Sequence, residues 1–288
     1  MSERIAIVGA SGQLGLSLLS AFAETDPIAL QRPEIDLLDP PTIVEALERY
    51  RPSLLINCAA YHDVALCEAN PKLAFELNAH AVDEIAAGCA AHGVVFAHIS
   101  TDYVFDGESE TPYAEDDRAT PVNVYGASKL AGEHLLARHA REHYIFRTSG
   151  LYGIHPSRSK GVTFVERMLR AAGAGTPLQV VDDIIFSPSY VEHVVAAIWR
   201  IIEHGAFGTY HVSNTGACSW YDLAEEAIRQ AGISASIERV QADSAQLPRR
   251  PPYSALAHRG IEALGIPDLP DWREGVAAYL AARRAVYA

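Results

Sequence analysis

The feature that most constrains the fold is a glycine-spaced turn near the start of the chain, between a strand pattern and a helix pattern. Residues 5–8 form a short apolar run with β-branched side chains, which is typical of a buried parallel strand. Gly9, Gly12 and Gly15 follow at intervals of three residues, and residues 16–22 have a helical pattern. Glycines at such a junction let the backbone approach a pyrophosphate, and the helix N-terminus supplies N–H groups and a partial positive charge. The junction therefore predicts a dinucleotide-binding unit; a turn with only a packing role is the alternative.

Strand and helix patterns alternate from this turn as far as residue 149, which is typical of an α/β protein with a doubly wound parallel sheet. The predicted strands cover residues 5–8, 27–30, 54–60, 94–102 and 144–148, and the predicted helices cover residues 16–22, 40–50, 71–92 and 121–133. We therefore expect a Rossmann-type NAD(P)-binding domain over residues 1–149, completed by segments around 189–215. Residues 150–288, in which the pattern loosens, are expected to form a smaller C-terminal substrate-binding domain of mixed α/β structure. Its predicted helices cover residues 191–203, 219–231 and 271–284.

The 288 residues carry a formal net charge of −13, with 49% apolar and 20% charged residues. This composition is ordinary for a globular protein, and the negative charge argues against a nucleic acid or an anionic membrane surface as a partner. No apolar run approaches the ~20 residues that a membrane span needs, and the first residues do not resemble a signal peptide. Cys58, Cys67, Cys89 and Cys218 lack metal-binding spacing, so we expect free thiols, mostly buried, and a cytoplasmic protein.

Tyr125 and Lys129 lie four residues apart in a predicted helix and therefore share one of its faces. A phenol titrates near pH ~10, and a nearby ammonium lowers that pKa toward the pH at which proton transfer is useful. The chain has only three lysines, and chance alone would give this spacing about one time in seven. The pair by itself is a moderate indication of a proton-transfer site.

The residues that follow two predicted strands bear on the cofactor and on the reaction. Arg32 follows residues 27–30 at a position where an acidic residue would bind a ribose 2′-hydroxyl and an arginine can accommodate a 2′-phosphate. We therefore expect NADPH as the cofactor, with NADH as an alternative and a solvated loop charge as the other interpretation of Arg32. Ser100 and Thr101 end another strand, at the edge where α/β proteins place their chemistry.

Two further clusters have an alternative, ordinary interpretation. His139 and His143, with His134 nearby, could form the edge of a metal site, but their charged neighbours favour a solvated helix face. We therefore predict no metal site. Arg249 and Arg250 could bind a substrate diphosphate, since the planar guanidinium suits that group, or they could lie in a surface loop. The sequence favours neither of these two interpretations of the arginine pair.

Four sequence motifs follow one another along the chain. They are Gly9-x-x-Gly12-x-x-Gly15, Asn57-Cys-Ala-Ala60-Tyr61, Ser100-Thr-Asp-Tyr-Val-Phe-Asp-Gly107 and Asn123-Val-Tyr125-Gly-x-x-Lys129-x-x-Gly132-Glu133. In this order they resemble the extended short-chain dehydrogenase/reductases, and most of all the dTDP-4-dehydrorhamnose reductase family. The resemblance covers nearly the whole chain, including Arg147-Thr-Ser149 and Ser254-Ala-Leu256. It implies NADPH-dependent reduction of the 4-keto group of a nucleotide-diphosphate-linked 4-keto-6-deoxy sugar, and it allows a homodimer. Some relatives bind a bridging Mg²⁺, which this sequence does not support.

The resemblance also implies roles for individual residues. Tyr125 would donate a proton to the ketone oxygen, Lys129 would bond the nicotinamide ribose and lower the phenol pKa, and Thr101 would hydrogen-bond the developing alkoxide. The implied cofactor-binding set is Gly9, Ser11, Gly12, Gln13, Leu14, Arg32, Asp36, Leu37, Ala59, Ala60, Tyr61, Asn78, Ser100, Tyr125 and Lys129. The implied substrate-binding set is Ser100, Asp102, Tyr103, Gly150, Phe186, Arg249 and Arg250.

The chain departs from the family pattern where the sugar is expected. Gly150 stands where rhamnose-forming reductases carry a tryptophan, and Ile184 and Phe186 stand where many relatives have glutamine and glycine. These changes spare the hydride-transfer residues but put the identity of the sugar in doubt. One alternative is a nucleotide-sugar epimerase or dehydratase, although a dehydratase would have Asp-Glu after Thr101. The other is a non-catalytic nucleotide-binding subunit of the same fold, like that associated with methionine adenosyltransferase.

Overall fold

Six parallel strands form one sheet in the order β2-β1-β3-β4-β5-β10. The structure is a computed structural model that describes residues 4–155, 161–243 and 248–287. In sheet order the strands are β2 (Ile28–Leu30), β1 (Ile5–Val8), β3 (Leu54–Asn57), β4 (Val95–Thr101), β5 (His143–Thr148) and β10 (Gly208–His211). The order reverses between β1 and β3, because the chain runs outward from β1 to β2 and then returns to β3. The expected doubly wound α/β fold is confirmed.

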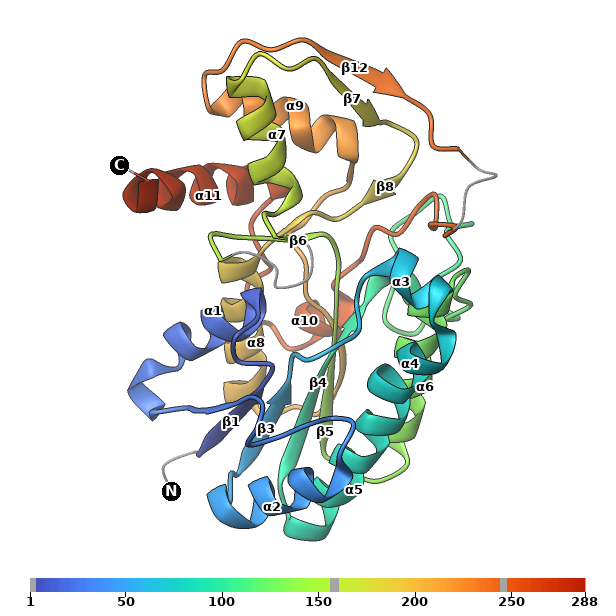
Figure 1. Ribbon diagram of the computed structural model, residues 1–288, viewed down its shortest axis with the longest axis vertical. Helices are drawn as coiled ribbons and strands as arrows, with labels where there is room; N and C mark the ends of the chain where they lie inside the picture. The colour runs from blue at the N-terminus through green and yellow to red at the C-terminus, as the bar shows by residue number, and fades with distance from the viewer. Residues whose placement is uncertain (1–3, 156–160, 244–247, 288) are drawn as a thin grey trace.

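Helices cover both faces of this sheet (Figure 1). They are α1 (Gln13–Ala21) and α8 (Val191–His204) on one face, and α2 (Pro40–Tyr50), α5 (Ala81–His92) and α6 (Val124–Ala137) on the other. Alternate residues of each strand supply the two cores: Ile5 and Ile7 pack with α1 and α8, whereas Ala6 and Val8 pack with α2 and α5. Burial on both faces explains why β1 is a continuous apolar run.

Two of the differences between predicted and observed helices bear on the site. The first begins at Gln13 rather than at residue 16, because Gly12 has extended backbone angles and is its N-cap. The helix predicted over residues 71–92 is divided into α4 (Pro71–Phe75), a π-helical turn η2 (Glu76–His80) and α5. The turn carries Asn78, and α6 packs against it at Gly132, where a Cβ would overlap the Asn78 carbonyl oxygen. The wider turn and the missing side chain thus let the two helices meet.

The second half of the chain adds a separate apolar core above the sheet (Figure 1). Three helices surround it, α7 (Phe164–Gly173), α9 (Trp220–Gln230) and α11 (Trp272–Tyr287), with α10 (Arg259–Ala263) lying nearer the sheet. Three strand pairs complete this part: β6 (Leu151–Tyr152) with β9 (Ser189–Tyr190), β7 (Leu178–Val181) with β12 (Ile237–Val240), and β8 (Ile185–Phe186) with β11 (Cys218–Ser219). Helix α8 and strand β10, from residues 191–211, return to the sheet. The domain boundaries stated above stay predictions.

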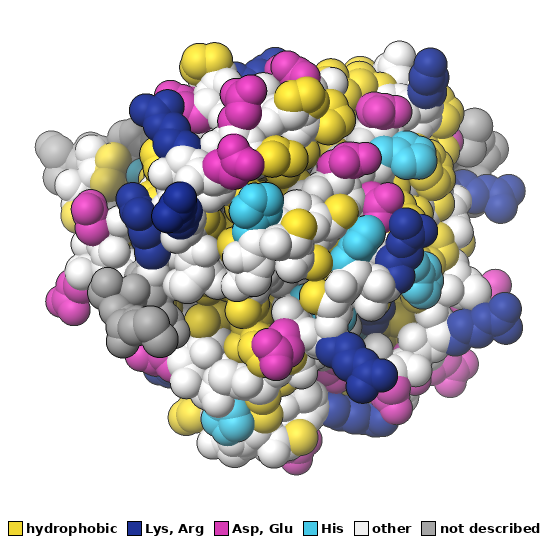
Figure 2. Space-filling model, turned by 90° about the horizontal axis from the view of Figure 1, so that it is seen from below, with side chains coloured by type: hydrophobic (Ala, Val, Ile, Leu, Met, Phe, Trp, Pro, Cys, Tyr) yellow, Lys and Arg dark blue, Asp and Glu magenta, His cyan; other side chains and the backbone are white. Residues whose placement is uncertain are grey.

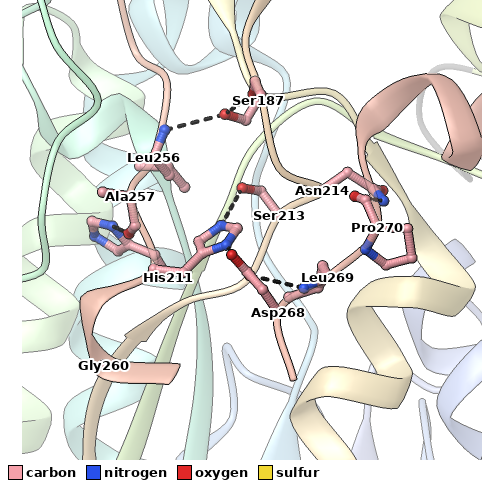
Figure 3. A network of polar contacts seen from close by, with 12 residues as sticks. Ser187, His211, Ser213, Asn214, Leu256, Ala257, Gly260, Asp268, Leu269 and Pro270 are labelled. Carbon is pink, nitrogen blue, oxygen red and sulfur yellow. Dashed lines mark hydrogen bonds and ion pairs between the residues drawn. The ribbon is translucent and has the colours of Figure 1, made fainter. Parts of the chain in front are cut away.

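A polar network attaches the C-terminal segment to the end of β10 (Figure 3). Ser213 Oγ lies 2.9 Å from His258 Nε2, and His258 Nδ1 lies 2.6 Å from Asp268 Oδ1. Asn214 donates through Nδ2 to the Pro270 carbonyl, 2.8 Å away. A serine, a histidine and an aspartate in this order have the connectivity of a hydrolytic triad. Ser213 is 0% exposed, however, so its hydroxyl cannot meet a substrate, and the network is structural.

The face seen from below in Figure 2 carries interspersed acidic and basic side chains. This face therefore has no continuous basic surface of the kind that contacts a nucleic-acid backbone. Within the described ranges, no helix combines the length and the apolar character needed to cross a membrane.

Glu166 joins the two helices α7 and α11 of the upper core. It accepts hydrogen bonds from Arg283 (2.6 Å), from Arg170 (2.7 Å) and from Tyr279 (2.7 Å), and its side chain is 6% exposed. Burial alone would raise the pKa of Glu166, but the hydrogen bonds from Arg283, Arg170 and Tyr279 lower it to about 2. The carboxylate is therefore stabilised in the folded state.

Replacing this carboxylate should destabilise the fold in a pH-dependent way. Glu166→Gln is expected to lower the free energy of unfolding at pH 7 by ~1–3 kcal/mol, because Arg283 loses a buried charged partner. The folded-state pKa is depressed, so the stabilisation is complete above pH ~4.5 and is lost as the pH falls toward 2. Urea denaturation at several pH values checks this, with exposed Glu262→Gln as the control. Equal stability of Glu166→Gln and the wild type at pH 7 would contradict the assignment.

Candidate active site

The glycine turn after β1 lies at the carboxyl edge of the sheet, beside the strand at which the order reverses. Gly9 has φ +76°, and a Cβ there would lie 2.8 Å from the Ala59 backbone nitrogen, in the loop after β3. A Cβ at Gly15 would overlap the carbonyl of Gly9. Open α/β sheets bind ligands at this reversal point, outside the carboxyl ends of the strands. The turn is therefore built from close backbone approaches that only glycine permits.

Helix α1 presents its N-terminus to the same place. Its N-cap, Gly12, has no capping side chain, and its first turn has no acidic residue, so its partial positive charge is not neutralised locally. Gln13 is partly buried, and its Nε2 atom has no hydrogen-bond partner among the described residues. The Leu14 side chain is buried in the core, so only its backbone can contact a ligand there. An unpartnered amide at an open helix N-terminus fits the pyrophosphate of a dinucleotide.

Asn78 holds the loop after β3 in position. Its Oδ1 accepts from the Tyr61 N–H (2.8 Å), and its Nδ2 donates to the Tyr61 carbonyl (2.8 Å) and to Ser128 Oγ (3.0 Å). Asn78 is buried, whereas Ala59, Ala60 and Tyr61 are half-buried along the loop. Asn78 thus acts on the expected cofactor groove through the backbone of Tyr61, and it links that loop to α6.

Residues expected at the adenine end lie beyond β2. Arg32 is exposed directly after the strand, so its guanidinium is accessible to a phosphate. The Asp36 carboxylate accepts from the Leu38 N–H (3.1 Å), and Leu37 is half-buried against the core under the sheet. Arg32, Asp36 and Leu37 thus follow β2, the edge strand that lies three positions from β4 in the sheet order.

Tyr125 and Thr101 meet over the carboxyl end of β4. Thr101 ends the strand, and a short 3₁₀ turn, η3 (Asp102–Val104), follows it. Tyr125 lies in the first turn of α6, where a Cβ at Gly126 would overlap the Tyr103 carbonyl oxygen. This contact presses α6 onto η3 and brings the Tyr125 side chain close to that of Thr101.

Asp102 lies beneath this pair, 3% exposed, and accepts hydrogen bonds from three hydroxyls. The donors are Thr101 (3.0 Å), Ser149 (2.8 Å) and Ser254 (2.6 Å). Burial raises the pKa of Asp102 to about 6, although hydrogen bonds from the serines and Thr101 oppose the rise. Thr101 gives its proton to Asp102, and its oxygen accepts from the Tyr103 N–H.

Lys129 lies below the site rather than against the Tyr125 phenol. Its Nζ atom is 2.8 Å from His98 Nε2 and donates to the Ile99 carbonyl at 2.6 Å. Burial lowers the pKa of Lys129 to about 8. Burial raises the pKa of Tyr125, and the interaction with Thr101 opposes the rise. The lowering of the phenol pKa by Lys129 stays a prediction, and in this structure the Lys129 side chain is directed toward His98.

Ser100 is part of a buried ion pair. Its hydroxyl donates to Glu133, and Glu133 receives Nε and Nη2 of Arg147 at 2.7–3.2 Å. Ser100, Glu133 and Arg147 are all buried, and so is Asp102. Ser100 and Asp102 therefore lie inside the protein rather than at its surface. Sequence reasoning assigned no role to Ser149, Ser254, His98, Glu133 or Arg147. The signal was present for the two serines, for Glu133 and for Arg147, which lie within the family motifs.

The expected substrate residues border Tyr125. The rings of Tyr103 and Tyr125 are 6.0 Å apart, edge to face. Burial raises the pKa of Tyr103 to about 12, and the nearby charge of Arg250 opposes the rise. Arg249 and Arg250 are both exposed, and the Arg249 carbonyl accepts from Asn123, the N-cap of α6, at 2.9 Å. The basic pair is thus attached by its backbone to the helix that carries Tyr125.

Gly150 and Phe186, two departures from the family pattern, lie against each other. Gly150 has φ +49°, and a Cβ there would overlap the edge of the Phe186 ring. Phe186 is 3% exposed and stacks on Trp220 with ring centroids 4.1 Å apart. The phenylalanine ring therefore fills the space that a side chain at position 150 would need. The two departures from the family pattern are therefore parts of a single change in side-chain packing.

The sequence predicts no metal site at the histidines and free thiols at the four cysteines. Within residues 4–155, 161–243 and 248–287, no cluster of three or more histidine, cysteine, aspartate or glutamate residues could hold a metal ion. His139 instead lies 2.6 Å from Asp83. The four cysteines are free; Cys58 is partly buried and the other three are buried, as expected.

Comparisons with known proteins agree with this geometry. The family model described as "RmlD substrate binding domain" matches residues 3–285. The chain is 37% identical over 292 residues to dTDP-4-dehydrorhamnose reductase of Mycobacterium tuberculosis H37Rv, covering 98% of this chain and 93% of that protein. It is 32% identical over 277 residues to dTDP-4-keto-6-deoxy-D-glucose reductase of Streptomyces niveus, covering 94% of each.

Among solved structures, dTDP-4-dehydrorhamnose reductase of Bacillus anthracis in complex with NADP superimposes with a TM-score of 0.93. Its sequence is 34% identical, and the match covers 98% of this chain and 100% of that one. UDP-glucose 4-epimerase of Thermus thermophilus, at 18% identity and a TM-score of 0.83, shares the fold. The sequence motifs, the fold and the family model agree, and the chain belongs to the RmlD family, the family of the dTDP-4-dehydrorhamnose reductases.

Proposed function

We propose that the protein reduces the 4-keto group of a nucleotide-linked 4-keto-6-deoxy sugar with NADPH. The observation that carries the proposal is the close approach of Tyr125 to Thr101, at the carboxyl edge where the glycine turn also lies. Relatives named as reductases of dTDP-linked keto sugars support the substrate class, and the NADP complex of the Bacillus anthracis protein supports the cofactor. A phenol beside a dinucleotide site suits the delivery of a proton to a ketone that receives a hydride.

Different residues bind different parts of the cofactor in this proposal. The Gly9–Gly15 turn and the N-terminus of α1 bind the pyrophosphate through backbone N–H groups, and Gln13 adds a side-chain donor. Ala59, Ala60 and Tyr61 shape the nicotinamide half of the groove. When bound, the reduced cofactor supplies the hydride.

Proton transfer falls to Tyr125. Its raised pKa keeps the phenol protonated at neutral pH, so it is ready to donate to the carbonyl oxygen of the sugar. Thr101 lies beside the phenol, and Asp102 with its serine partners holds Thr101 in position. A bond from Thr101 to the developing alkoxide requires its hydroxyl to rotate away from Asp102.

The sugar side of the cleft is where this chain differs from rhamnose-forming relatives. Phe186 and Trp220 form a stacked aromatic wall beside Gly150. The 4-keto-6-deoxy class follows from the relatives, and this wall selects among its members. Arg249 and Arg250 are exposed beside the N-cap of α6, and in this proposal they bind the nucleotide diphosphate.

The reductase proposal is tested by replacing the proton donor. With NADPH and dTDP-4-dehydrorhamnose or a related 4-keto sugar, Tyr125→Phe should lower kcat by about 10²–10⁴-fold, because the phenolic proton is gone. NADPH affinity, measured by fluorescence titration, should stay within about twofold, and Tyr50→Phe is the control. No NADPH oxidation by the wild type with any 4-keto sugar would refute the function, and a fully active Tyr125→Phe would refute the role.

The cofactor preference should depend on Arg32. Arg32→Ala is expected to raise the Kd of NADPH by about tenfold or more and to leave the Kd of NADH unchanged, since only NADPH has the 2′-phosphate. Calorimetric titration with both cofactors measures this, and Arg229→Ala, far from the sheet, is the matched control. A parallel loss for both cofactors would show that Arg32 does not contact the phosphate.

The pairing of Gly150 with Phe186 can be measured as a coupling energy. Gly150→Ala should destabilise the protein by ~1–3 kcal/mol beyond the cost of its positive φ, because the methyl group overlaps the Phe186 ring. In a Phe186→Ala background that excess should disappear. Gly93 has φ +66°, and a Cβ there would meet open space. Gly93→Ala therefore measures the destabilisation caused by the positive φ alone. Additive effects of the two changes on urea denaturation would exclude the pairing.

A further inference from the structure

Residues 249–256 form a segment that lies between β8 and the loop that follows η3. Backbone hydrogen bonds pair the segment with β8, because the Ile185 N–H donates to the Pro252 carbonyl and the Ser254 N–H donates to the Ile185 carbonyl, both at 2.8 Å. Pro252 also lies against Gly107, where a Cβ would be 2.5 Å from the proline Cδ. The segment therefore joins a strand of the C-terminal half to the reactive edge of the sheet.

Two side-chain hydrogen bonds hold this segment to α6 and to η3. Asn123, the N-cap of α6, donates through Nδ2 to the Arg249 carbonyl at 2.9 Å, while its Oδ1 accepts from the Gly126 N–H at 2.8 Å. Ser254 donates through Oγ to Asp102 Oδ2 at 2.6 Å. Asn123, Ser254 and Asp102 are 6%, 1% and 3% exposed, so water has little access to these bonds.

The position of the arginine pair depends on the first of these bonds. Among hydrogen bonds between described residues, the bond from Asn123 is the only one that Arg249 or Arg250 makes. Burial raises the pKa of Tyr103, and the charge of Arg250 opposes the rise, which places that charge near the phenol. The Tyr103 ring is in turn 6.0 Å from that of Tyr125. One amide group thus fixes the arginine pair relative to the expected proton donor.

The second bond acts on Thr101 through Asp102. The Asp102 carboxylate accepts the hydroxyl protons of Thr101 at 3.0 Å, of Ser149 at 2.8 Å and of Ser254 at 2.6 Å. Burial raises the pKa of Asp102 to about 6, and the hydrogen bond from Ser254 is the strongest of the three that oppose the rise. Ser254 therefore helps to fix the carboxylate that receives the Thr101 proton.

We propose that Asn123 and Ser254 are positioning residues that fasten residues 249–254 to the reactive site, so that the diphosphate of the substrate is held in register with Tyr125 and Thr101. The inference rests on the proposed reductase function, in which Arg249 and Arg250 bind the diphosphate. A hydride and a proton reach one ketone only when the sugar is held in a single position. The same segment then aligns the nucleotide end of the substrate with its reacting end.

Limited proteolysis measures the first bond without cofactor or substrate. Trypsin cuts after Arg249 but not after Arg250, which precedes Pro251, and the carbonyl that it attacks is the one held by Asn123. Asn123→Ser keeps an oxygen that caps α6 but is too short to reach that carbonyl. Cleavage after Arg249, followed by mass spectrometry, should be about threefold to tenfold faster than in the wild type. Cleavage after Arg141, in the loop after α6, should change by less than about twofold.

An unchanged rate after Arg249, or an equal rise after Arg141, would overturn the proposal. Asn123→Asp also caps the helix and cannot donate, so it should reproduce the faster cleavage if Asn123→Ser fails to fold. Because neither ligand is needed, this result distinguishes a failure of the inference from a failure of the proposed reductase activity.

Steady-state kinetics with the nucleotide sugar test the register. Asn123→Ser should raise KM by about threefold to tenfold and change kcat by less than about twofold, because the arginine pair loses its position while Tyr125 keeps its capped helix. Ser187→Ala is the control, since Ser187 bonds Leu256 of the same segment at 3.2 Å and contacts neither α6 nor η3. A wild-type KM in Asn123→Ser would overturn the assignment.

Ser254→Ala tests the second bond through the pH dependence of kcat/KM. The titratable groups that face Asp102 are the phenols of Tyr103 and Tyr125, whose pKa values are raised by burial, so Asp102 is the one that titrates near pH 6. Activity should fall as the pH falls through about 6, because the protonated acid no longer accepts all three hydroxyls. Without the hydrogen bond that lowers this pKa, the acid limb should move up by about one pH unit. Ser254→Thr, which keeps the hydroxyl, should restore the limb, and an unmoved limb in Ser254→Ala would overturn the role of Ser254.

Discussion

The close approach of α6 to the carboxyl edge of the sheet is the constraint on which the site depends. Gly126 and Gly132 permit it, since side chains there would overlap carbonyl oxygens of η3 and of the π-helical turn η2. The first contact sets Tyr125 beside Thr101, and the second brings α6 to Asn78, which holds the Tyr61 backbone. One helix position thus arranges both the proton donor and the groove expected to hold the cofactor.

Below this helix the interior is unusually polar, and each buried charge has a compensating arrangement. Glu133 is paired with Arg147, and Asp102 receives three hydroxyl protons. Lys129 has a carbonyl and an imidazole as partners. Removing one partner from such a network is costly, because the remaining group is left buried without solvation. The networks therefore hold the reactive groups in one geometry rather than simply adding stability.

The packing around Gly150 and Phe186 is separate from the residues around Tyr125. The residues around Tyr125 follow the family motifs. Gly150 and Phe186 do not follow them, and these two residues pack against each other. A reductase can therefore keep its proton donor and its dinucleotide site while the shape that selects the sugar changes.

The sequence by itself determined the fold class, the glycine turn and the Tyr125–Thr101 site, because these depend on local periodicity and on motifs with fixed spacing. It could not show that Lys129 turns to His98, that Ser254 reaches Asp102 across 152 residues of chain, or that Phe186 fills the space beside Gly150. These contacts join segments that are distant in sequence, so only the tertiary structure decides them. The protonation states follow the same division, since burial and distant partners, not residue type, determine the pKa values of Tyr125, Asp102 and Lys129.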